Sequence, residues 1–278
     1  MALRFTKMHG LGNDFMVINA IQQSIDLTPI QIAALAMRGT GIGFDQCLLI
    51  EKSPEKDIDF FYRIFNADGH EVGQCGNGAR CLARFVQQYG LTKKKSIHVA
   101  THTTRMQLRI NEDSTVTVDM GQPRFEPSDI PLKARKQAML YPLSLPHHES
   151  CSIHAVSVGN PHAVMVVPDI TTAPVQVLGQ LISEHPLFPE QTNVGFMQLL
   201  NPNHIRLRVY ERGCAETSAC GSGAVAAVAI GRRYHALSDK VRVSLPGGDL
   251  MVSWPKLEGP VFLTGPATFV YEGLLLDD

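Results

Sequence analysis

Short strand-like runs of apolar residues, separated by turn residues, dominate the first half of the chain. Two such runs within residues 5–20, joined by the Gly/Asn/Asp-rich turn 9–14, predict a pair of strands. Residues 47–51 and 59–65 predict two more strands, and the alternation across 96–119 is typical of a meander of short strands. The first half is therefore predicted to consist mainly of β-structure.

Two helices interrupt these strands. The dipeptide Thr28-Pro29 supplies an N-cap and a first helical residue, and it predicts a helix that ends near Arg38. A second helix, rich in small apolar residues, is predicted over about 78–89, after a loop over 66–74.

The second half repeats this arrangement. Strands are predicted at 153–158, 163–167 and 205–210 and near Gly195, Val241, Leu250 and Phe262, and helices at about 175–183 and 223–234. Residues 268–271 are rich in β-branched and aromatic side chains, and they predict a last strand that returns to the first domain.

An internal repeat accounts for the similarity of the two halves. A shift of 145 residues places segment 63–79 over 208–224 with identical residues at Arg63, Glu71, Cys75, Gly76, Gly78 and Ala79. A shift of 147 places Gly12-Asn13 over Gly159-Asn160 and Gln46 over Asn193. The two shifts differ by a two-residue length change in a loop, and the matched order favours duplication over chance. The repeat is too long for a solenoid, so it predicts two like domains.

A composition change marks the boundary between the two halves. Segment 121–148 holds five prolines, as domain connections often do. We therefore predict an α+β protein with one domain over 1–120 plus the C-terminal strand 266–278, a second over 121–265, and an active site in the cleft between them.

Composition limits the classes of function. The chain has 278 residues, 44% hydrophobic and 18% charged, with a formal net charge of -1, which is typical of a soluble globular protein. The charge gives no general attraction to nucleic acid or to membranes, and we expect neither as a partner. The first seven residues turn polar before a signal-peptide core could form, so we expect a cytoplasmic protein.

Six cysteines raise the questions of disulfides and of zinc. A chain of this length without a signal segment is expected to keep its thiols reduced. Two pairs of cysteines each have five residues between them, which is wider than structural zinc ligands require, and we expect no metal site. Cys47, Cys81 and Cys151 are interpreted as structural, whereas Cys214 lies in the loop that approaches Cys220.

The two matched cysteines carry the predicted chemistry. Cys75 and Cys220 each follow a strand-like run and open a helix, where backbone N–H groups and the helix dipole favour a thiolate. The glycines after each cysteine let a substrate carboxylate approach the same N–H groups. A thiolate and a thiol on opposite sides of one carbon atom are the equipment of an amino-acid racemase or epimerase. Such an enzyme spreads the carbanion charge onto the bound carboxylate, and we expect no cofactor.

Six segments together resemble the diaminopimelate epimerase family. They are residues 9–15 (HGLGNDF), 41–46 (GIGFDQ), 65–69 (FNADG), 74–81 (QCGNGARC), 159–162 (GNPH) and 210–223 (YERGCAETSACGSG). The resemblance implies two pseudo-symmetric domains, each a mostly antiparallel sheet or barrel wrapped around a central helix. It implies interconversion of L,L- and meso-diaminopimelate, in lysine and peptidoglycan precursor biosynthesis, by Cys75 and Cys220. It further implies a homodimer, with Tyr271 in the strand linked to the dimer contact.

The resemblance also implies roles for further residues. His162 and Glu211 match residues that assist the proton transfers. Substrate contacts are expected from Asn13, Gln46, Asn66, Gly76, Asn77, Asn160, Asn193, Glu211, Arg212, Gly221 and Ser222. Arg212 could clamp a carboxylate in a bidentate manner, and side-chain amides could both donate and accept.

Structural interpretations stand beside these roles. Asn13 and Asn160 could be turn residues, His162 a hydrogen-bonded residue at a strand start, Arg212 a solvated surface charge and Tyr271 a packed strand aromatic. One departure from the family is Cys214-Ala215 where Ala-Gly is common, which adds a thiol and removes a flexible residue.

Three other functions fit part of the pattern. Proline and hydroxyproline racemases also use two cysteines, but they usually carry His at the position of Asn77. Isomerases of the phenazine-pathway type lack the cysteine pair. A non-catalytic amino-acid-binding protein would bind its ligand without exchanging the α-proton.

Overall fold

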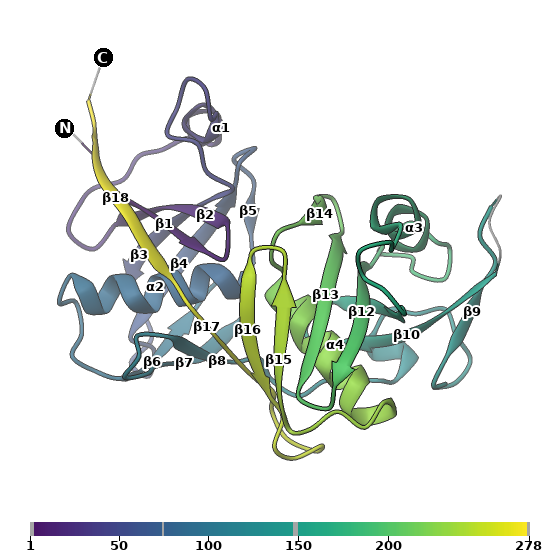
Figure 1. Ribbon diagram of the computed structural model, residues 1–278. Coiled ribbons are helices and arrows are strands. Elements are labelled where there is room, and N and C mark those ends of the chain that lie inside the picture. The colour runs from purple at the N-terminus through teal and green to yellow at the C-terminus, as the bar shows by residue number, and fades with distance from the viewer. Residues whose placement is uncertain (1–2, 74, 147–149, 277–278) are drawn as a thin grey trace. The chain divides into compact units, whose positions relative to one another are not determined.

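The computed structural model describes residues 3–73, 75–146 and 150–276, and the chain divides into two compact units (Figure 1). Unit 1 comprises Met1–Val118 with Gly265–Asp278, and unit 2 comprises Asp119–Thr264. Gln74, the first residue of the first cysteine segment, and His148 at the end of the proline-rich stretch lie outside the described residues.

Unit 1 is a mixed sheet with two helices. Its strand order is β18 (Thr268–Leu275), β1 (Leu3–Gly10), β2 (Asn13–Asn19), β3 (Gln46–Lys52), β4 (Phe60–Asn66), β6 (Ser96–Ala100), β7 (Arg105–Ile110) and β8 (Val116–Asp119), with β5 (Glu71–Val72) beside β4. The β2–β3 and β4–β6 pairs are parallel and the others are antiparallel. The C-terminal strand thus pairs with the N-terminal one.

Helix α2 (Gly76–Gln88) is the central helix of unit 1. It contacts β1, β2, β3 and β7, and most of its side chains are buried (Figure 1). Helix α1 (Pro29–Ala36) packs on the opposite face of β2 and β3, where Ile32 joins a cluster with Met16 and Leu49. Its N-terminus is stabilised by a capping box between Thr28 and Gln31.

Unit 2 has the same plan. Its strand order is β9 (Tyr141–Leu143), β10 (Cys151–Ser157), β11 (Pro161–Val166), β12 (Asn193–Asn201), β13 (His204–Glu211), β15 (Lys240–Leu245), β16 (Gly248–Ser253) and β17 (Phe262–Gly265), with β14 (Ala215–Thr217) beside β13. Helix α4 (Gly221–Tyr234) contacts β10 to β13 and β16, whereas α3 (Val175–Ser183) packs on β12 and β13.

The strand registers confirm the duplication. Phe15 pairs with Gln46 between parallel β2 and β3, and the residues 147 positions later, His162 and Asn193, pair between parallel β11 and β12. The ion pair between Arg63 and Glu71 recurs 145 positions later, between Arg208 and Glu216, and α2 and α4 start 145 residues apart. Two pseudo-symmetric domains with a sheet around a helix are therefore observed.

Four short elements were not predicted: β5, β9, β14 and the 3-10 turn Pro127–Asp129. Each has only two or three residues, which is too few for an alternating pattern to show. The helices predicted from Gly78 and Gly223 begin two residues earlier, at Gly76 and Gly221, because each cysteine itself is the N-cap. Within the described ranges, no helix is both long and apolar enough to cross a bilayer.

Candidate active site

Cys75 caps the N-terminus of α2. Its backbone is extended (φ -151°, ψ 109°), and its sulfur accepts a hydrogen bond from the backbone N–H of Gly78 at 3.3 Å. The helix packs closely here, since a Cβ on Gly78 would lie 3.2 Å from the Leu48 side chain. The sulfur therefore lies half-buried at the positive end of the helix dipole, which favours its thiolate.

Two amide side chains adjoin this thiol. The Cys75 sulfur lies 3.9 Å from Oδ1 of Asn13, within the long range of sulfur hydrogen bonds, and Asn77 Nδ2 donates to the same oxygen at 3.1 Å. Asn77 in turn accepts from the buried guanidinium of Arg80 at 2.8 Å. Asn13 opens β2 directly after Gly12, which has φ 90°, a conformation that suits glycine.

Gln46 and Asn66 form a second amide pair in unit 1. They face each other across the antiparallel β3–β4 pair, and Gln46 Nε2 donates to Asn66 Oδ1 at 2.9 Å. The Gln46 Oε1 atom is buried and has no hydrogen-bond partner among the described residues. A buried acceptor without a protein partner suits a ligand that carries N–H donors.

Cys220 occupies the matching position in unit 2, as the N-cap of α4 (φ -119°, ψ 109°). Its side chain is buried, and it donates to Glu211 Oε2 at 3.1 Å, while Thr217 donates to the other oxygen of the same carboxylate. Burial and then the negative charge of Glu211 raise the pKa of the Cys220 thiol well above its ordinary value. The thiol thus has a carboxylate in place to receive its proton.

His162 is fully buried beside Asn160, with Nε2 3.1 Å from Asn160 Oδ1. Burial, and then the charge of Arg212, lower the pKa of His162 to about 3, so the ring is neutral near pH 7. Its Nδ1 atom has no partner among the described residues. Asn193 accepts from the backbone N–H of Arg212 at 2.9 Å, and the Arg212 side chain donates to Glu190 O at 2.7 Å.

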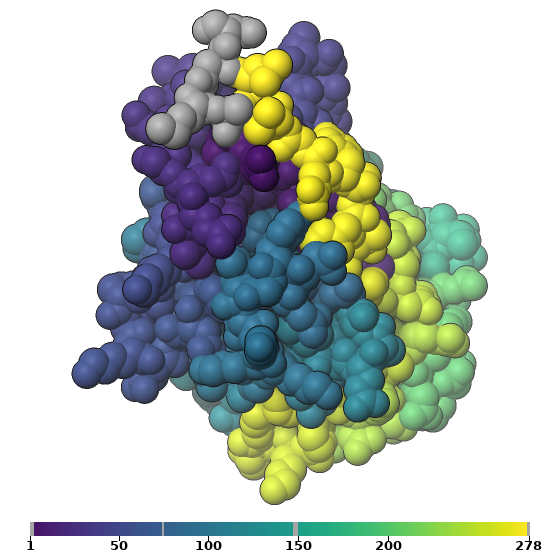
Figure 2. Space-filling model, turned by 90° about the vertical axis from the view of Figure 1, so that its left-hand side faces the viewer, coloured from purple at the N-terminus to yellow at the C-terminus, as the bar shows by residue number. Residues whose placement is uncertain are grey.

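Each unit thus gathers its own half of the predicted residues. Tyr271 lies apart on β18, opposite Lys7, where its ring packs edge-on against Phe5 with centroids 6.0 Å apart. Figure 2 shows β18, in yellow, at the surface of unit 1, and Tyr271 is 45% exposed. Its neighbours Val270 and Leu274 are exposed as well.

The remaining cysteines differ in their surroundings. Cys47 and Cys81 are fully buried, and burial raises the pKa of the Cys81 thiol to about 12 and that of Cys47 further. These two match the structural interpretation. Cys151 is half-buried with a raised pKa, and Cys214 is exposed. Among the described residues, no group of three or more His, Cys, Asp or Glu side chains could hold a metal ion.

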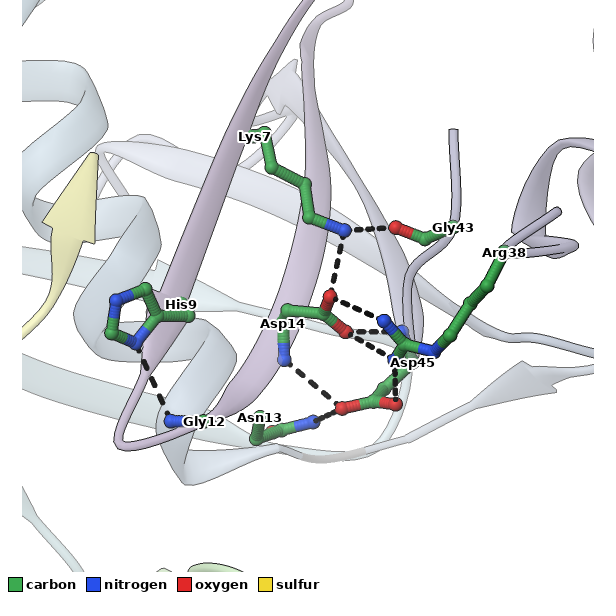
Figure 3. Close-up of polar contacts among 8 residues, drawn as sticks. All are labelled: Lys7, His9, Gly12, Asn13, Asp14, Arg38, Gly43 and Asp45. Atoms are coloured by element: carbon green, nitrogen blue, oxygen red, sulfur yellow. Dashed lines mark hydrogen bonds and ion pairs between the residues drawn. The ribbon is translucent and has the colours of Figure 1, made fainter. Parts of the chain in front are cut away.

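A charged cluster beside Asn13 was not predicted from the sequence (Figure 3). Asp14 accepts two bonds from Arg38, at 2.9 and 3.0 Å, and forms an ion pair with Lys7 at 2.7 Å. Asp45 accepts from Arg38 at 2.8 Å and from Asn13 Nδ2 at 3.0 Å. Burial would raise the pKa of Asp14, but the bonds and charges of Arg38 and Lys7 outweigh it and lower that pKa to about 2. The sequence signal was that Asp14 and Asp45 stand at the starts of two strands, within the segments 9–15 and 41–46 that resemble the family.

Comparisons with known proteins find one family over most of the chain. The family model described as diaminopimelate epimerase matches residues 5–126 and 154–270. The diaminopimelate epimerase of Legionella pneumophila strain Philadelphia 1 is 63% identical over 276 residues, covering 99% of this chain and 100% of that protein. The same figures hold for the protein of strain Corby.

Solved structures share the fold at low identity. A phenazine biosynthesis protein of the PhzF family from Bacillus anthracis matches with a TM-score of 0.70 and 17% identity, and both chains are covered completely. A hydroxyproline epimerase from Agrobacterium vitis matches with a TM-score of 0.69 and 13% identity, over 100% of this chain and 93% of that one.

Proposed function

The chain belongs to the diaminopimelate epimerase family, and from this premise we propose that it interconverts L,L- and meso-diaminopimelate by a two-base mechanism that uses Cys75 and Cys220. The observation that carries the proposal is the matched pair of cysteine N-caps, one on the central helix of each repeat. Proline racemase chemistry is not favoured, because the relatives at 63% identity are diaminopimelate epimerases whereas a hydroxyproline epimerase shares only 13%.

The proposed reaction moves one proton off the α-carbon and another onto its opposite face. A thiolate takes the α-proton and becomes a thiol, while the electron pair of the broken C–H bond spreads onto the substrate carboxylate. The other thiol then donates its proton to the opposite face, which re-forms the C–H bond inverted and leaves a thiolate. Backbone N–H groups at a helix N-terminus stabilise the carboxylate charge without a cofactor.

Glu211 is the proposed proton acceptor for Cys220. A thiol with a raised pKa is a poor base until its proton has been removed, and the Glu211 carboxylate lies 3.1 Å from the sulfur. Neutral His162 is the second proposed assistant. Because Nε2 carries the N–H toward Asn160 Oδ1, Nδ1 of the uncharged ring holds the lone pair and, without a partner among the described residues, can accept a proton.

The remaining candidates are proposed substrate contacts. Gln46 Oε1 offers an acceptor to a substrate ammonium, and the guanidinium of Arg212 keeps donors beyond the one bound to Glu190. Backbone N–H groups near the first residues of the two helices are proposed for the α-carboxylate. The full set is Asn13, Gln46, Asn66, Gly76, Asn77, Asn160, Asn193, Glu211, Arg212, Gly221 and Ser222.

We also propose a cytoplasmic homodimer, with Tyr271 at the dimer contact. The exposed apolar side chains of β18 support this proposal, since a strand that leaves Val270, Tyr271 and Leu274 exposed can bury them against a second copy. The domain limits 1–120 with 266–278, and 121–265, remain our prediction, and no nucleic-acid or membrane partner is proposed.

Proton NMR in D₂O tests the activity. Reduced protein incubated with L,L-diaminopimelate, without pyridoxal phosphate, should exchange the α-proton and produce the meso isomer. If neither α-proton exchange nor the meso isomer appears while the thiols are verified as free, the substrate assignment is refuted, and proline and hydroxyproline would be tested next. Cys75→Ala and Cys220→Ala should each lose epimerisation while circular dichroism shows an unchanged fold. Near-normal turnover by either variant would rule out the two-base mechanism.

A further inference from the structure

We propose that Asp45 and Arg80 are positioning residues that fix the direction of two side-chain amides, so that Asn13 turns its carbonyl oxygen toward Cys75. The inference rests on the proposed function only for the role of Cys75. The orientation itself follows from the chemistry of the groups at the two ends of a hydrogen-bonded chain in unit 1.

Asp45 sets the direction of the Asn13 amide. A carboxylate can only accept hydrogen bonds, and Asp45 Oδ2 lies 3.0 Å from the Asn13 side-chain nitrogen and 3.0 Å from the backbone nitrogen of Asp14. Asn13 must therefore present its NH₂ group to Asp45. Its carbonyl oxygen points the other way, toward Asn77 and Cys75.

Arg80 sets the direction of the Asn77 amide. A guanidinium can only donate, and Arg80 Nη2 lies 2.8 Å from Asn77 Oδ1. Asn77 is therefore left with its NH₂ group to donate to Asn13. Arg80 is fully buried and donates to Pro266 O at 3.1 Å as well, so its position is fixed. Gly10 admits this packing, because a Cβ there would lie 3.1 Å from Arg80 Nη2.

The charged cluster holds Asp45 in turn. Asp14 and Asp45 bind each other reciprocally, each carboxylate accepting from the other's backbone N–H, at 2.9 and 3.0 Å. Arg38 bonds to both carboxylates, and Lys7 on β1 forms an ion pair with Asp14, so that two cations balance the two negative charges (Figure 3). Asp45 bonds directly to Asn13 and so acts on the thiol through the Asn13 amide, and the through-space effect of its charge is measured separately with Asp45→Asn below.

Cys75 consequently lies between an acceptor and a donor. The Asn13 carbonyl favours the thiol, and the Gly78 N–H favours the thiolate. Cys75 interacts electrostatically with Tyr62 on β4 and with Arg80 and Cys81 on α2. A reversed Asn13 amide would place a second donor at the sulfur and hold it as a thiolate. The observed orientation serves both protonation states, which a residue that alternates between acid and base requires.

Alkylation of the substrate-free protein tests the inference. The rate at which iodoacetamide modifies Cys75 is followed against pH by mass spectrometry of the Cys75 peptide, which gives the thiol pKa. Asp45→Ala removes the acceptor that holds the Asn13 NH₂ group and leaves Asn77 as the remaining restraint on the amide, so it should lower that pKa and speed alkylation at neutral pH by roughly three- to tenfold. Asp45→Asn removes the same charge but keeps an oxygen for Asn13, and it should stay close to the wild-type rate. Arg38→Gln, which does not touch Asn13, is the control for the ion cluster.

A double-mutant cycle separates positioning from a structural effect. Asn13→Ala removes the carbonyl and should also speed alkylation of Cys75, and adding Asp45→Ala to it should change nothing further. Equal rates for Asp45→Ala and Asp45→Asn, or an additive double variant, would overturn the inference. Asn13→Ala leaves Asp45 and its ion pairs intact. A wild-type rate of Cys75 alkylation in Asn13→Ala would therefore refute the inference even if Asp45→Ala did not fold. No substrate is present, so these outcomes do not depend on whether the protein epimerises diaminopimelate.

Discussion

Replacing Glu211 by Gln tests the proton transfer at Cys220. The carboxylate accepts from two donors, the Cys220 thiol at one oxygen and the Thr217 hydroxyl at the other. A glutamine of the same shape has only one oxygen, so its NH₂ group must face one of these two donors. The variant therefore loses the negative charge and one of the two hydrogen bonds together.

The expected loss follows from the role of a positioned base. General acid–base assistance contributes about 10²- to 10⁴-fold, so kcat/KM for Glu211→Gln should fall by about 100-fold or more, or about 2.7 kcal/mol in activation free energy. The loss should appear mainly in kcat. Because a catalyst cannot change the equilibrium between the two isomers, kcat/KM must fall by the same factor in both directions.

The assay is proton NMR in D₂O from each pure isomer, with Glu216→Gln as the matched control. Glu216 lies on β14 and pairs with Arg208 at 2.6 and 2.8 Å, so its replacement removes the same charge from the same hairpin without touching Cys220. The control should stay within about threefold of the wild-type rate, since its charge serves an ion pair and not the reacting thiol. A Glu211→Gln protein within that same range would refute the assignment of Glu211 as the proton acceptor.

Three further predictions concern stability and thiol reactivity. Gly179→Ala should destabilise the fold by about 1–3 kcal/mol in denaturant titration, because the added Cβ would lie 2.5 Å from the Tyr210 side chain. Burial lowers the pKa of His162 to about 3 from an ordinary value of 6.5. As the pH falls between these values, the unfolded state binds a proton that the folded state does not, and the free energy of unfolding decreases. His162→Phe should make this decrease smaller, as measured by denaturant titration at several pH values. Iodoacetamide should modify Cys75 before Cys220 at neutral pH. The Cys75 thiol is half-buried and bonded to an N–H, whereas the Cys220 thiol is buried and has a raised pKa. The reverse order of modification in peptide mass spectrometry would contradict this prediction.

The order of helices and strands and the division into two similar halves could be predicted from the sequence, because both follow from hydrophobic periodicity and from the internal repeat. Helix α3 has the bounds 175–183 that the pattern predicted. The 147-residue shift that aligned Gln46 with Asn193 is also the shift between the two parallel strand registers. A repeat detected in the sequence therefore carried information on strand pairing, which a single strand pattern does not.

The charged cluster beside Asn13 could not be predicted in the same way. Asp14 and Asp45 are 31 residues apart, and they meet only because β2 and β3 pair in parallel with Asp45 N bound to Asp14 O. Lys7 also donates to the carbonyl of Gly43, whose φ of 72° turns that loop toward β1. Local sequence gives neither this register nor this turn, and an Asp at a strand start reads as an ordinary turn residue.

The two repeats share one fold but surround their thiols with different groups, and this difference suits the proposed two-base mechanism. Cys75 faces the amide of Asn13, but the equivalent Asn160 is bound to His162. Cys220 instead faces Glu211, which stands 145 residues after Asn66 and therefore at the position of an uncharged residue in the first repeat. Identical surroundings would give two thiols equal proton affinities, and neither would be favoured as the acid or the base. An amide beside one thiol and a carboxylate beside the other make the affinities unequal, so one thiol and one thiolate can coexist before the substrate arrives.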